Sequence, residues 1–297
     1  MNTFFLDRLN SEPHALAFAG QSTPWPVALA DQSANPALDE ALHTHAAAAQ
    51  ALLYPVSAEL LATTGRPVDL FGFEPNPARL GAAAAASASV PGIALTQLGA
   101  LLDAAALGYN PAQAKPVAVL GHSQGVLAVH MVQAICEAGS IDAAAAKIDE
   151  ILAIATLIGV AGTRQARQLG LAARHGEATP MLSVKDITRA QVDALIERVD
   201  GARGPIAVAV TNSATHYVLS GYPEDLAAFG VEVAKEHKRQ AKLREEKVRG
   251  GRVFDPTLEY LDVTLPFHSP LMADAVSQAV AWAEACGINA DHARELA

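Results

Sequence analysis

The stretch that decides the fold is Val117-Ala-Val-Leu-Gly-His-Ser-Gln-Gly125. The apolar run Pro116–Leu120 predicts a strand buried on both faces of a parallel sheet. The next residues, Val126–Glu137, have a helical pattern that ends before Gly139. A Gly-x-Ser-x-Gly turn between a strand and a helix is the pattern of a nucleophile elbow, which lifts its serine off the sheet. We therefore expect Ser123 to be a nucleophile; the alternative is a structural turn serine.

A serine nucleophile needs a base, and His268 is the strongest candidate among the 10 histidines. It lies in Pro266-Phe-His-Ser-Pro270, directly after an expected strand, and catalytic groups of α/β folds lie at strand ends. His122 adjoins Ser123, but we expect it to point away and to pack or hydrogen-bond beneath the turn. For each histidine the alternative is a non-catalytic residue.

The order of elements predicts an α/β protein with an insertion. Between Pro180 and Leu265 the patterns follow the order β-α-β-β-α-β, the split βαβ (ferredoxin-like) order. The remainder has the pattern of a parallel α/β fold. The expected strands are Leu16–Gln21, Pro116–Leu120, Pro180–Val184, Ile206–Val210, Tyr217–Leu219 and Leu258–Leu265, and the expected helices are Leu38–Ala62, Val90–Leu107, Val126–Glu137, Ala143–Leu171, Thr188–Val199 and Glu224–Gln240, with loops at Phe71–Ala78 and Asn110-Pro111.

Composition excludes several classes of protein. With 297 residues, 51% of them hydrophobic and 18% charged, the chain is too apolar to be disordered. A net charge of −10 argues against nucleic-acid binding. Cys136 and Cys286 lack disulfide-framework or zinc spacing, so we expect no metal. No signal-peptide pattern and no run of ~18 uninterrupted apolar residues occurs, so we expect a cytoplasmic protein that does not enter a membrane.

Four ordered segments resemble the motifs of the acyl-CoA:acyl carrier protein acyltransferases, the acyltransferase domains of fatty acid and polyketide synthases. These are Phe18-Ala-Gly-Gln21, Gly121-His-Ser-Gln-Gly125, Ala209–Gly221 and Pro266–Met272, and the resemblance spans residues 16–275. The glutamine of GHSQG is similar to the acetyltransferase domain of type I fatty acid synthases of fungal and actinobacterial kind. The bacterial version is favoured by Gly72–Pro75 and Lys247–Phe254.

The resemblance implies an α/β-hydrolase-like large subdomain with a parallel sheet, residues 1–177 and 266–297, and an inserted ferredoxin-like small subdomain, residues 178–265. It implies that Ser123 is acylated, that His268 acts as base and then as acid, and that the backbone N–H groups of Gln21 and Gln124 form the oxyanion hole. Asn212 matches a motif asparagine and is implied to support the site; a turn-forming role is the alternative. For Gln21 the alternative is a polar residue that caps a strand end.

One departure from the family pattern concerns the acyl group. Malonyl-transferring relatives carry an arginine that pairs with the free carboxylate. The matching stretch here, Ile151–Gly159, has no arginine, and Ile158 stands at that position. An unpaired malonyl carboxylate would cost several kcal/mol, so the site should prefer an uncharged group such as acetyl. Arg164 or Arg167 would fill the role if the alignment slipped, and Ile158 is equally compatible with a plain core position.

The resemblance therefore implies transfer of acetyl from acetyl-CoA, through acyl-Ser123, to the phosphopantetheine thiol of acyl carrier protein. No cofactor is expected within the chain itself. The expected partners are the carrier protein and the other domains of a homo-oligomeric multienzyme, of which the chain would be an N-terminal portion. The alternatives are a malonyl or palmitoyl transferase of the same family, an α/β-hydrolase esterase or thioesterase, and a scaffold domain with vestigial chemistry.

A basic stretch remains outside this scheme. Ala234–Arg252 holds eight Lys and Arg against three Glu in an otherwise acidic chain. It is interpreted as a solvated helix face within a larger assembly, and the alternative is a surface for CoA phosphates or an acidic carrier protein.

Overall fold

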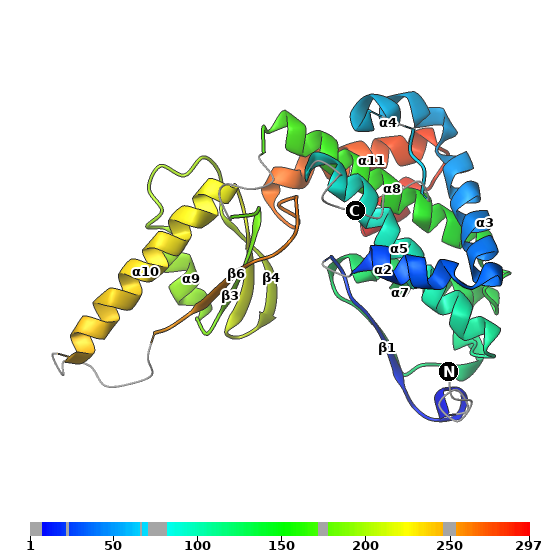
Figure 1. Ribbon diagram of the computed structural model, residues 1–297, viewed down its shortest axis with the longest axis horizontal. Coiled ribbons are helices and arrows are strands. Elements are labelled where there is room, and N and C mark those ends of the chain that lie inside the picture. The colour runs from blue at the N-terminus through cyan, green and yellow to red at the C-terminus, as the bar shows by residue number, and fades with distance from the viewer. Residues whose placement is uncertain (1–7, 22–23, 66, 71–81, 172–177, 246–253) are drawn as a thin grey trace. The chain divides into compact units, whose positions relative to one another are not determined.

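The computed structural model describes residues 8–21, 24–65, 67–70, 82–171, 178–245 and 254–297, with the side chains of residues 82–85 and 245 left out. The described chain divides into two compact units, residues 1–164 with 275–297, and residues 165–274 (Figure 1). The predicted loop at Phe71–Ala78 lies outside the described residues, as do the segment Gly72–Pro75 and all but the last residue of Lys247–Phe254.

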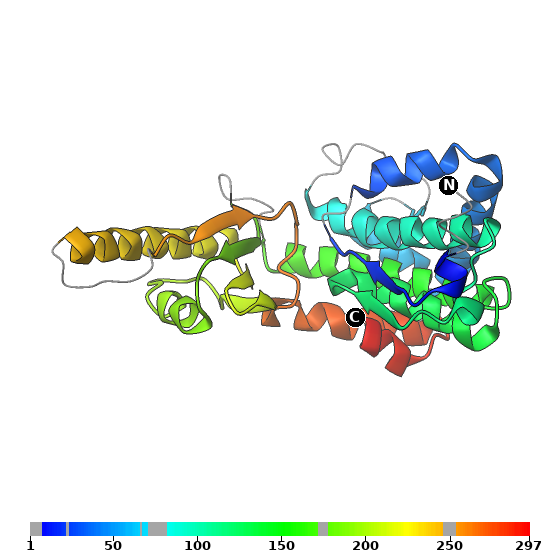
Figure 2. The same cartoon turned by 90° about the horizontal axis from the view of Figure 1, so that it is seen from below.

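The first unit is built on a pair of parallel strands. Strand β1 (Ala15–Phe18) pairs with β2 (Ala118–Gly121), and Phe18 lies opposite Gly121. Both views place β1 along the outside of the packed helices (Figures 1 and 2). The helices are α2 (Trp25–Ser33), α3 (Pro36–Leu52), α4 (Ser57–Thr64), α5 (Ala82–Ala106), α6 (Pro111–Ala114), α7 (Val126–Ala138), α8 (Ala145–Gln168, whose last residues enter the second unit), α11 (Ala273–Ala285, whose first residues belong to the second unit) and α12 (Ala290–Leu296).

The expectation that the strand before Ser123 is buried on both faces is wrong for the described part of the chain. Val117 and Leu120 are 71% and 60% exposed, and Ala118 and Val119 between them are only half-buried. The paired strand β1 alternates exposed with half-buried residues, which is typical of a strand covered on one face only. The apolar run did predict the strand and its parallel pairing, but an apolar run does not show which neighbours cover it.

Helix α5 starts earlier than expected. The sequence placed its start near Val90 because Pro91 favours a first helical turn, whereas the helix begins at Ala82 and contains Pro91. The preceding alanine-rich residues have high helix propensity, which favours the longer helix. A short helix, α6, also replaces the loop expected at Asn110-Pro111, and the Asn110 side chain caps it by accepting the Ala112 N–H at 2.9 Å.

The helix predicted at Leu38–Ala62 is interrupted: α3 ends at Leu52, a short 3-10 turn that contains Pro55 follows, and α4 begins at Ser57. Strand β1 ends at Phe18 rather than at the predicted Gln21, and helix α2 was not predicted.

The helix after Ser123 ends at Gly139 in the left-handed conformation that the sequence predicts (φ 88°). Among the described residues, one helical segment, Ala86–Ala106 of α5, has the length and composition to cross a membrane. It is 67% buried inside the protein, as in a core helix.

The second unit is a sheet covered by two helices. Strands β3 (Met181–Lys185), β4 (Ala207–Ser213), β5 (His216–Ser220) and β6 (Thr257–Tyr260) lie in the order β4-β5-β3-β6 with every pair antiparallel. Helices α9 (Arg189–Ile196) and α10 (Pro223–Glu245) bury Val192, Leu195, Leu226, Phe229 and Val233 against sheet residues such as Leu182 and Leu219. The elements follow the predicted order, and the expected insertion, 178–265, falls within this unit. The last strand is shorter than predicted, since it ends at Tyr260.

Candidate active site

Ser123 lies on a sharp turn between β2 and α7. Its backbone has φ 53°, a left-handed value that non-glycine residues rarely adopt and that commonly marks functional turns. The turn is tight: a Cβ on Gly121 would lie 2.5 Å from the carbonyl carbon of Gly125, and one on Gly125 would lie 2.3 Å from the Phe18 oxygen. Both motif glycines are therefore required by close backbone contacts, as the sequence predicts for a nucleophile elbow.

The loop after β1 lies directly against this turn. A Cβ on Gly20 would lie 3.1 Å from the Ser123 Cβ and 3.2 Å from the Gln124 backbone nitrogen. The Gln21 side chain donates a hydrogen bond from Nε2 to Gln124 Oε1 at 2.5 Å. The two residues expected to form the oxyanion hole are thus neighbours, although they are 103 positions apart in the sequence.

Helix α5 contributes contacts that sequence analysis did not identify. Gln124 Nε2 donates to the Val90 carbonyl at 2.5 Å, and Ser89 Oγ donates to Gln21 Oε1 at 3.3 Å. Gln97 Nε2 donates to the Ala19 carbonyl at 2.7 Å. A polar residue within an apolar helix was the available signal for Gln97, but its partner could not be deduced from one sequence.

His268 belongs to the second unit, where the preceding residues are firmly anchored. Leu261 donates its N–H to the Met181 carbonyl at 3.0 Å, and Phe267 packs against a cluster that contains Met181, Val218 and Val263. His268 itself has φ 56° and is exposed. The loop thus presents the imidazole at the surface of its unit, and Ser123 and His268 lie in different units.

The two residues expected to support the site, His122 and Asn212, are both exposed. His122 is exposed, so the expectation that it packs beneath the turn is wrong; its backbone N–H bonds the Phe18 carbonyl at 2.9 Å. Asn212 is exposed near the end of β4, where its Nδ2 lies 3.4 Å from His216 Nε2. This contact spans the β4–β5 hairpin, and it fits the turn-supporting alternative.

The proposed selectivity position lies on α8. Ile158 is half-buried, and its neighbour Gly159 packs so closely on α5 that a Cβ there would lie 2.6 Å from the Ala86 carbonyl oxygen. Arg164, the nearer of the alternative arginines, donates from Nη1 to Gln278 Oε1 at 2.7 Å and lies 5.8 Å from the Trp282 ring centroid. Its guanidinium is engaged by α11, whereas Arg167 is exposed.

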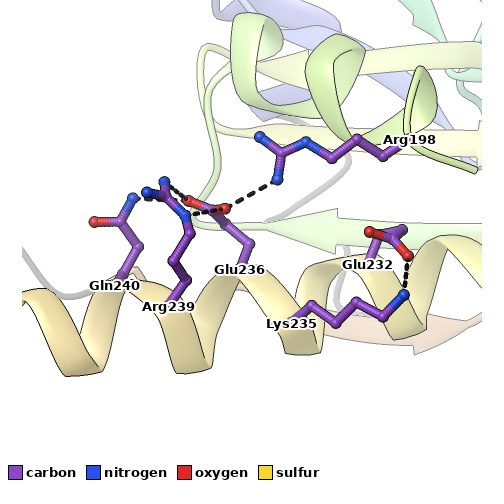
Figure 3. A network of polar contacts seen from close by, with 6 residues as sticks. All are labelled: Arg198, Glu232, Lys235, Glu236, Arg239 and Gln240. Carbon is purple, nitrogen blue, oxygen red and sulfur yellow. Dashed lines mark hydrogen bonds and ion pairs between the residues drawn. The ribbon is translucent and has the colours of Figure 1, made fainter.

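Two basic residues of the stretch Ala234–Arg252, Lys235 and Arg239, form ion pairs with glutamates of α10. Figure 3 shows Glu236 of α10 between Arg198 and Arg239, and Lys235 against Glu232. The Glu236 carboxylate is 9% exposed, and hydrogen bonding by Arg239 lowers its pKa from 4.5 to about 2. The exposed side chains of Lys235 and Arg239 fit the interpretation of the stretch as a solvated helix face.

Within the part of the chain that the structure describes, no group of three or more His, Cys, Asp or Glu side chains could hold a metal ion. Burial raises the pKa of the Cys136 thiol, and also that of Cys286. Raised values disfavour the thiolate, so neither cysteine has the character of a nucleophile.

The chain is similar to proteins of fatty acid synthesis. Residues 180–260 match the family model described as the fatty acid synthase central AT domain. The chain is similar to fatty acid synthase subunit beta of Schizosaccharomyces pombe, with 27% identity over 209 residues that cover 63% of this chain and 10% of the relative. It spans a tenth or less of the length of the curated relatives it matches.

Two solved structures resemble nearly the whole chain. One is a malonyl CoA-acyl carrier protein transacylase from Coxiella burnetii (TM-score 0.55, 19% identity, 92% of this chain and 68% of that chain). The other is a malonyl-transacylase solved in complex with a type II polyketide synthase acyl-carrier protein (TM-score 0.53, 17% identity, 94% and 71%). At these identities the likeness establishes the fold, which is the α/β fold of acyltransferases.

Proposed function

We propose that the chain is an acyltransferase domain of a fatty acid synthase that moves an acetyl group from acetyl-CoA to acyl carrier protein through acyl-Ser123. The observation that carries the proposal is the Ser123 turn. A serine in the left-handed conformation stands at the start of a helix, with the Gly20–Gln21 loop held against it. The match of residues 180–260 to the fatty acid synthase model and the acyltransferase fold support the reaction class.

In the first half-reaction, Ser123 Oγ attacks the thioester carbonyl carbon while His268 takes the hydroxyl proton. The carbonyl oxygen becomes an oxyanion, which the N–H groups of Gln21 and Gln124 stabilise. When the intermediate collapses, the C–S bond breaks, and CoA leaves as a thiol with the proton returned by His268.

The second half-reaction reverses these steps with a new nucleophile. His268 takes the proton of the phosphopantetheine thiol, and the sulfur attacks the acyl-serine carbonyl. The C–O bond to Ser123 breaks, the serine recovers its proton, and the acyl group leaves on the carrier protein. We further propose that this takes place in the cytoplasm, within a homo-oligomeric multienzyme whose other domains use the product, and that the chain needs no cofactor of its own.

The preference for acetyl over malonyl rests on α8. A malonyl carboxylate requires a cationic partner, and Ile158 offers none. Arg164 already bonds Gln278 and lies over Trp282, so it is not available without breaking those contacts.

The experiment is a competition between acetyl-CoA and malonyl-CoA, with transfer to holo-acyl carrier protein and hydrolysis to water measured together. We expect acetyl transfer to exceed malonyl transfer at least tenfold, and transfer to exceed hydrolysis. Ile158→Arg should shift the ratio toward malonyl, and Arg164→Gln should leave it unchanged. Preferential malonyl transfer by the unmodified chain would contradict the acetyl assignment, and rapid hydrolysis with no transfer would favour an esterase or thioesterase.

A further inference from the structure

Gln97 is a buried polar side chain in the middle of α5. It is 8% exposed, and its Nε2 donates to the Ala19 carbonyl at 2.7 Å across 78 positions of sequence. Its Oε1 is buried and has no hydrogen-bond partner within the described residues. A buried, half-satisfied amide lowers stability relative to an apolar side chain, so its presence in an otherwise apolar helix segment calls for a reason.

The bonded carbonyl occupies a specific place beside the Ser123 turn. Ala19 immediately precedes Gly20, where an added Cβ would lie 3.1 Å from the Ser123 Cβ and 3.2 Å from the Gln124 backbone nitrogen. The Ala19 oxygen also lies near the turn from the other side, since a Cβ on Gly125 would be 3.1 Å from it. Fixing Ala19 therefore fixes the peptide that leads to the Gln21 N–H.

Helix α5 also contacts the side chains of the two residues expected to form the oxyanion hole. Gln124 Nε2 donates to the Val90 carbonyl, and Ser89 Oγ donates to Gln21 Oε1. Residue 97 lies about two helical turns after residues 89 and 90. One helix therefore contacts both the loop after β1 and the turn after β2. Such contacts set the distance between the two N–H groups that would bind the oxyanion.

We infer that Gln97 is a positioning residue that holds the Ala19–Gln21 loop against the Ser123 turn and so sets the geometry of the oxyanion hole. This inference rests on the proposed function. Gln97 does not touch the acyl group; it acts through the Ala19 carbonyl. Displacing an oxyanion donor by about 1 Å weakens transition-state stabilisation while leaving substrate binding largely intact.

The protein supplies a matched control in Gln32 of α2. Its Nε2 likewise donates to a backbone carbonyl, that of Thr96 at 2.9 Å, and its Oε1 is also buried without a partner among the described residues. Its bond joins α2 to α5 and does not involve the Ser123 turn. Gln97→Met and Gln32→Met therefore remove the same kind of bond with the same change of shape.

The test measures the single-turnover rate of Ser123 acylation by acetyl-CoA, the apparent KM for acetyl-CoA, and the melting temperature of the 297-residue chain for both variants. We expect Gln97→Met to slow acylation about tenfold to a hundredfold with KM changed less than threefold, and Gln32→Met to stay within twofold of the unmodified rate. Gln97→Glu, which places a carboxylate opposite the Ala19 oxygen, should be slower than Gln97→Met.

An acylation rate for Gln97→Met within twofold of the unmodified rate would overturn the inference. Equal losses of acylation rate in Gln97→Met and Gln32→Met, in proportion to the fall in their melting temperatures, would also overturn it. These results differ from failure of the proposed function itself, in which the unmodified chain forms no adduct at Ser123.

Discussion

At the scale of single residues, the Ser123 turn leaves no space for side chains at its two glycines. Gly125 is the sharper case, because its added Cβ would lie 2.3 Å from the Phe18 oxygen and 2.9 Å from the Phe18 carbonyl carbon. Both atoms belong to the backbone of β1, which cannot move without disturbing the paired strand β2. A side chain at position 125 would therefore push β1 away from the turn and disturb its pairing with β2.

We expect Gly125→Ala to abolish acylation of Ser123 and to lower the melting temperature, because the turn and β1 must separate. Gly139→Ala is the control: its φ is 88° and nothing lies within 4 Å of an added Cβ, so it costs only about 1 kcal/mol of backbone strain. Acylation should survive in that variant. Normal acylation in Gly125→Ala, measured by mass spectrometry of the intact chain, would show that the turn differs from the one described.

Residue patterns were sufficient for part of the site and insufficient for the rest. The glycines and the flanking strand and helix predicted the sharp turn at Ser123, because such a turn is a local structure. Gln97 and the bond between Gln21 and Gln124 are long-range contacts, and a single sequence does not determine them. His122 was misjudged for a related reason, since the burial of a turn residue depends on what packs over it.

At the scale of elements, a buried carboxylate joins α10 to the loop before β4. Asp225 is 5% exposed, and its two oxygens accept the backbone N–H groups of Arg203 and Gly204, each at 3.0 Å. Arg203 also lies over the Tyr222 ring, 4.2 Å from its centroid. One side chain in the first turn of α10 thus holds the loop that leads into β4, 22 positions earlier in the sequence.

Asp225→Asn should lower the free energy of unfolding by about 1–3 kcal/mol, because the amide –NH₂ cannot accept the second N–H and leaves it unpaired. Asp193→Asn is the matched control, since the Asp193 carboxylate is exposed and, among the described residues, pairs with exposed Arg189; we expect a change below about 0.5 kcal/mol. Urea unfolding of both variants decides the matter. Equal, small changes would mean that the buried contact contributes little.

The ion pairs of α10 give a prediction about pH. Hydrogen bonds from Arg239, Gln240 and Arg198 lower the pKa of Glu236 from 4.5 to about 2, against the opposing effect of burial. A depressed carboxyl pKa adds stability that is present above pH 4.5 and is lost as the pH falls toward 2. We expect Glu236→Gln to lower the free energy of unfolding by about 1 kcal/mol at pH 7, a modest amount because Arg198 and Arg239 are half-exposed. The variant's free energy of unfolding should also change less between pH 4.5 and pH 2 than that of the unmodified chain. If the stability of Glu236→Gln, measured by unfolding at several pH values, fell below pH 4.5 as steeply as that of the unmodified chain, the result would contradict the ion pairs of Glu236.

The elements themselves were largely predictable, and the errors have physical causes. Helices α7, α8, α9 and α10 and the order of the second unit followed from periodicity and capping residues. The start of α5 was misplaced because proline is tolerated inside this helix, where Gly92 packs against the Trp25 ring. The burial of β2 was overestimated because hydrophobicity does not specify which neighbours are present.

At the scale of the whole molecule, the candidate chemistry is divided between two compact units. Ser123, Gln21, Gln124 and Ile158 belong to the unit that contains β1 and β2, whereas His268 and Asn212 belong to the unit with the antiparallel sheet. The central claim is that Ser123 carries the acyl group and His268 activates it.

The most direct measurement is peptide mass spectrometry after a brief reaction with acetyl-CoA, applied to the unmodified chain, Ser123→Ala and His268→Ala. We predict an acetyl group on Ser123 in the unmodified chain, none in Ser123→Ala, and formation at least a thousandfold slower in His268→Ala, as expected when a general base is lost from a serine nucleophile. An adduct that persists in Ser123→Ala, or an undiminished rate in His268→Ala, would contradict the account.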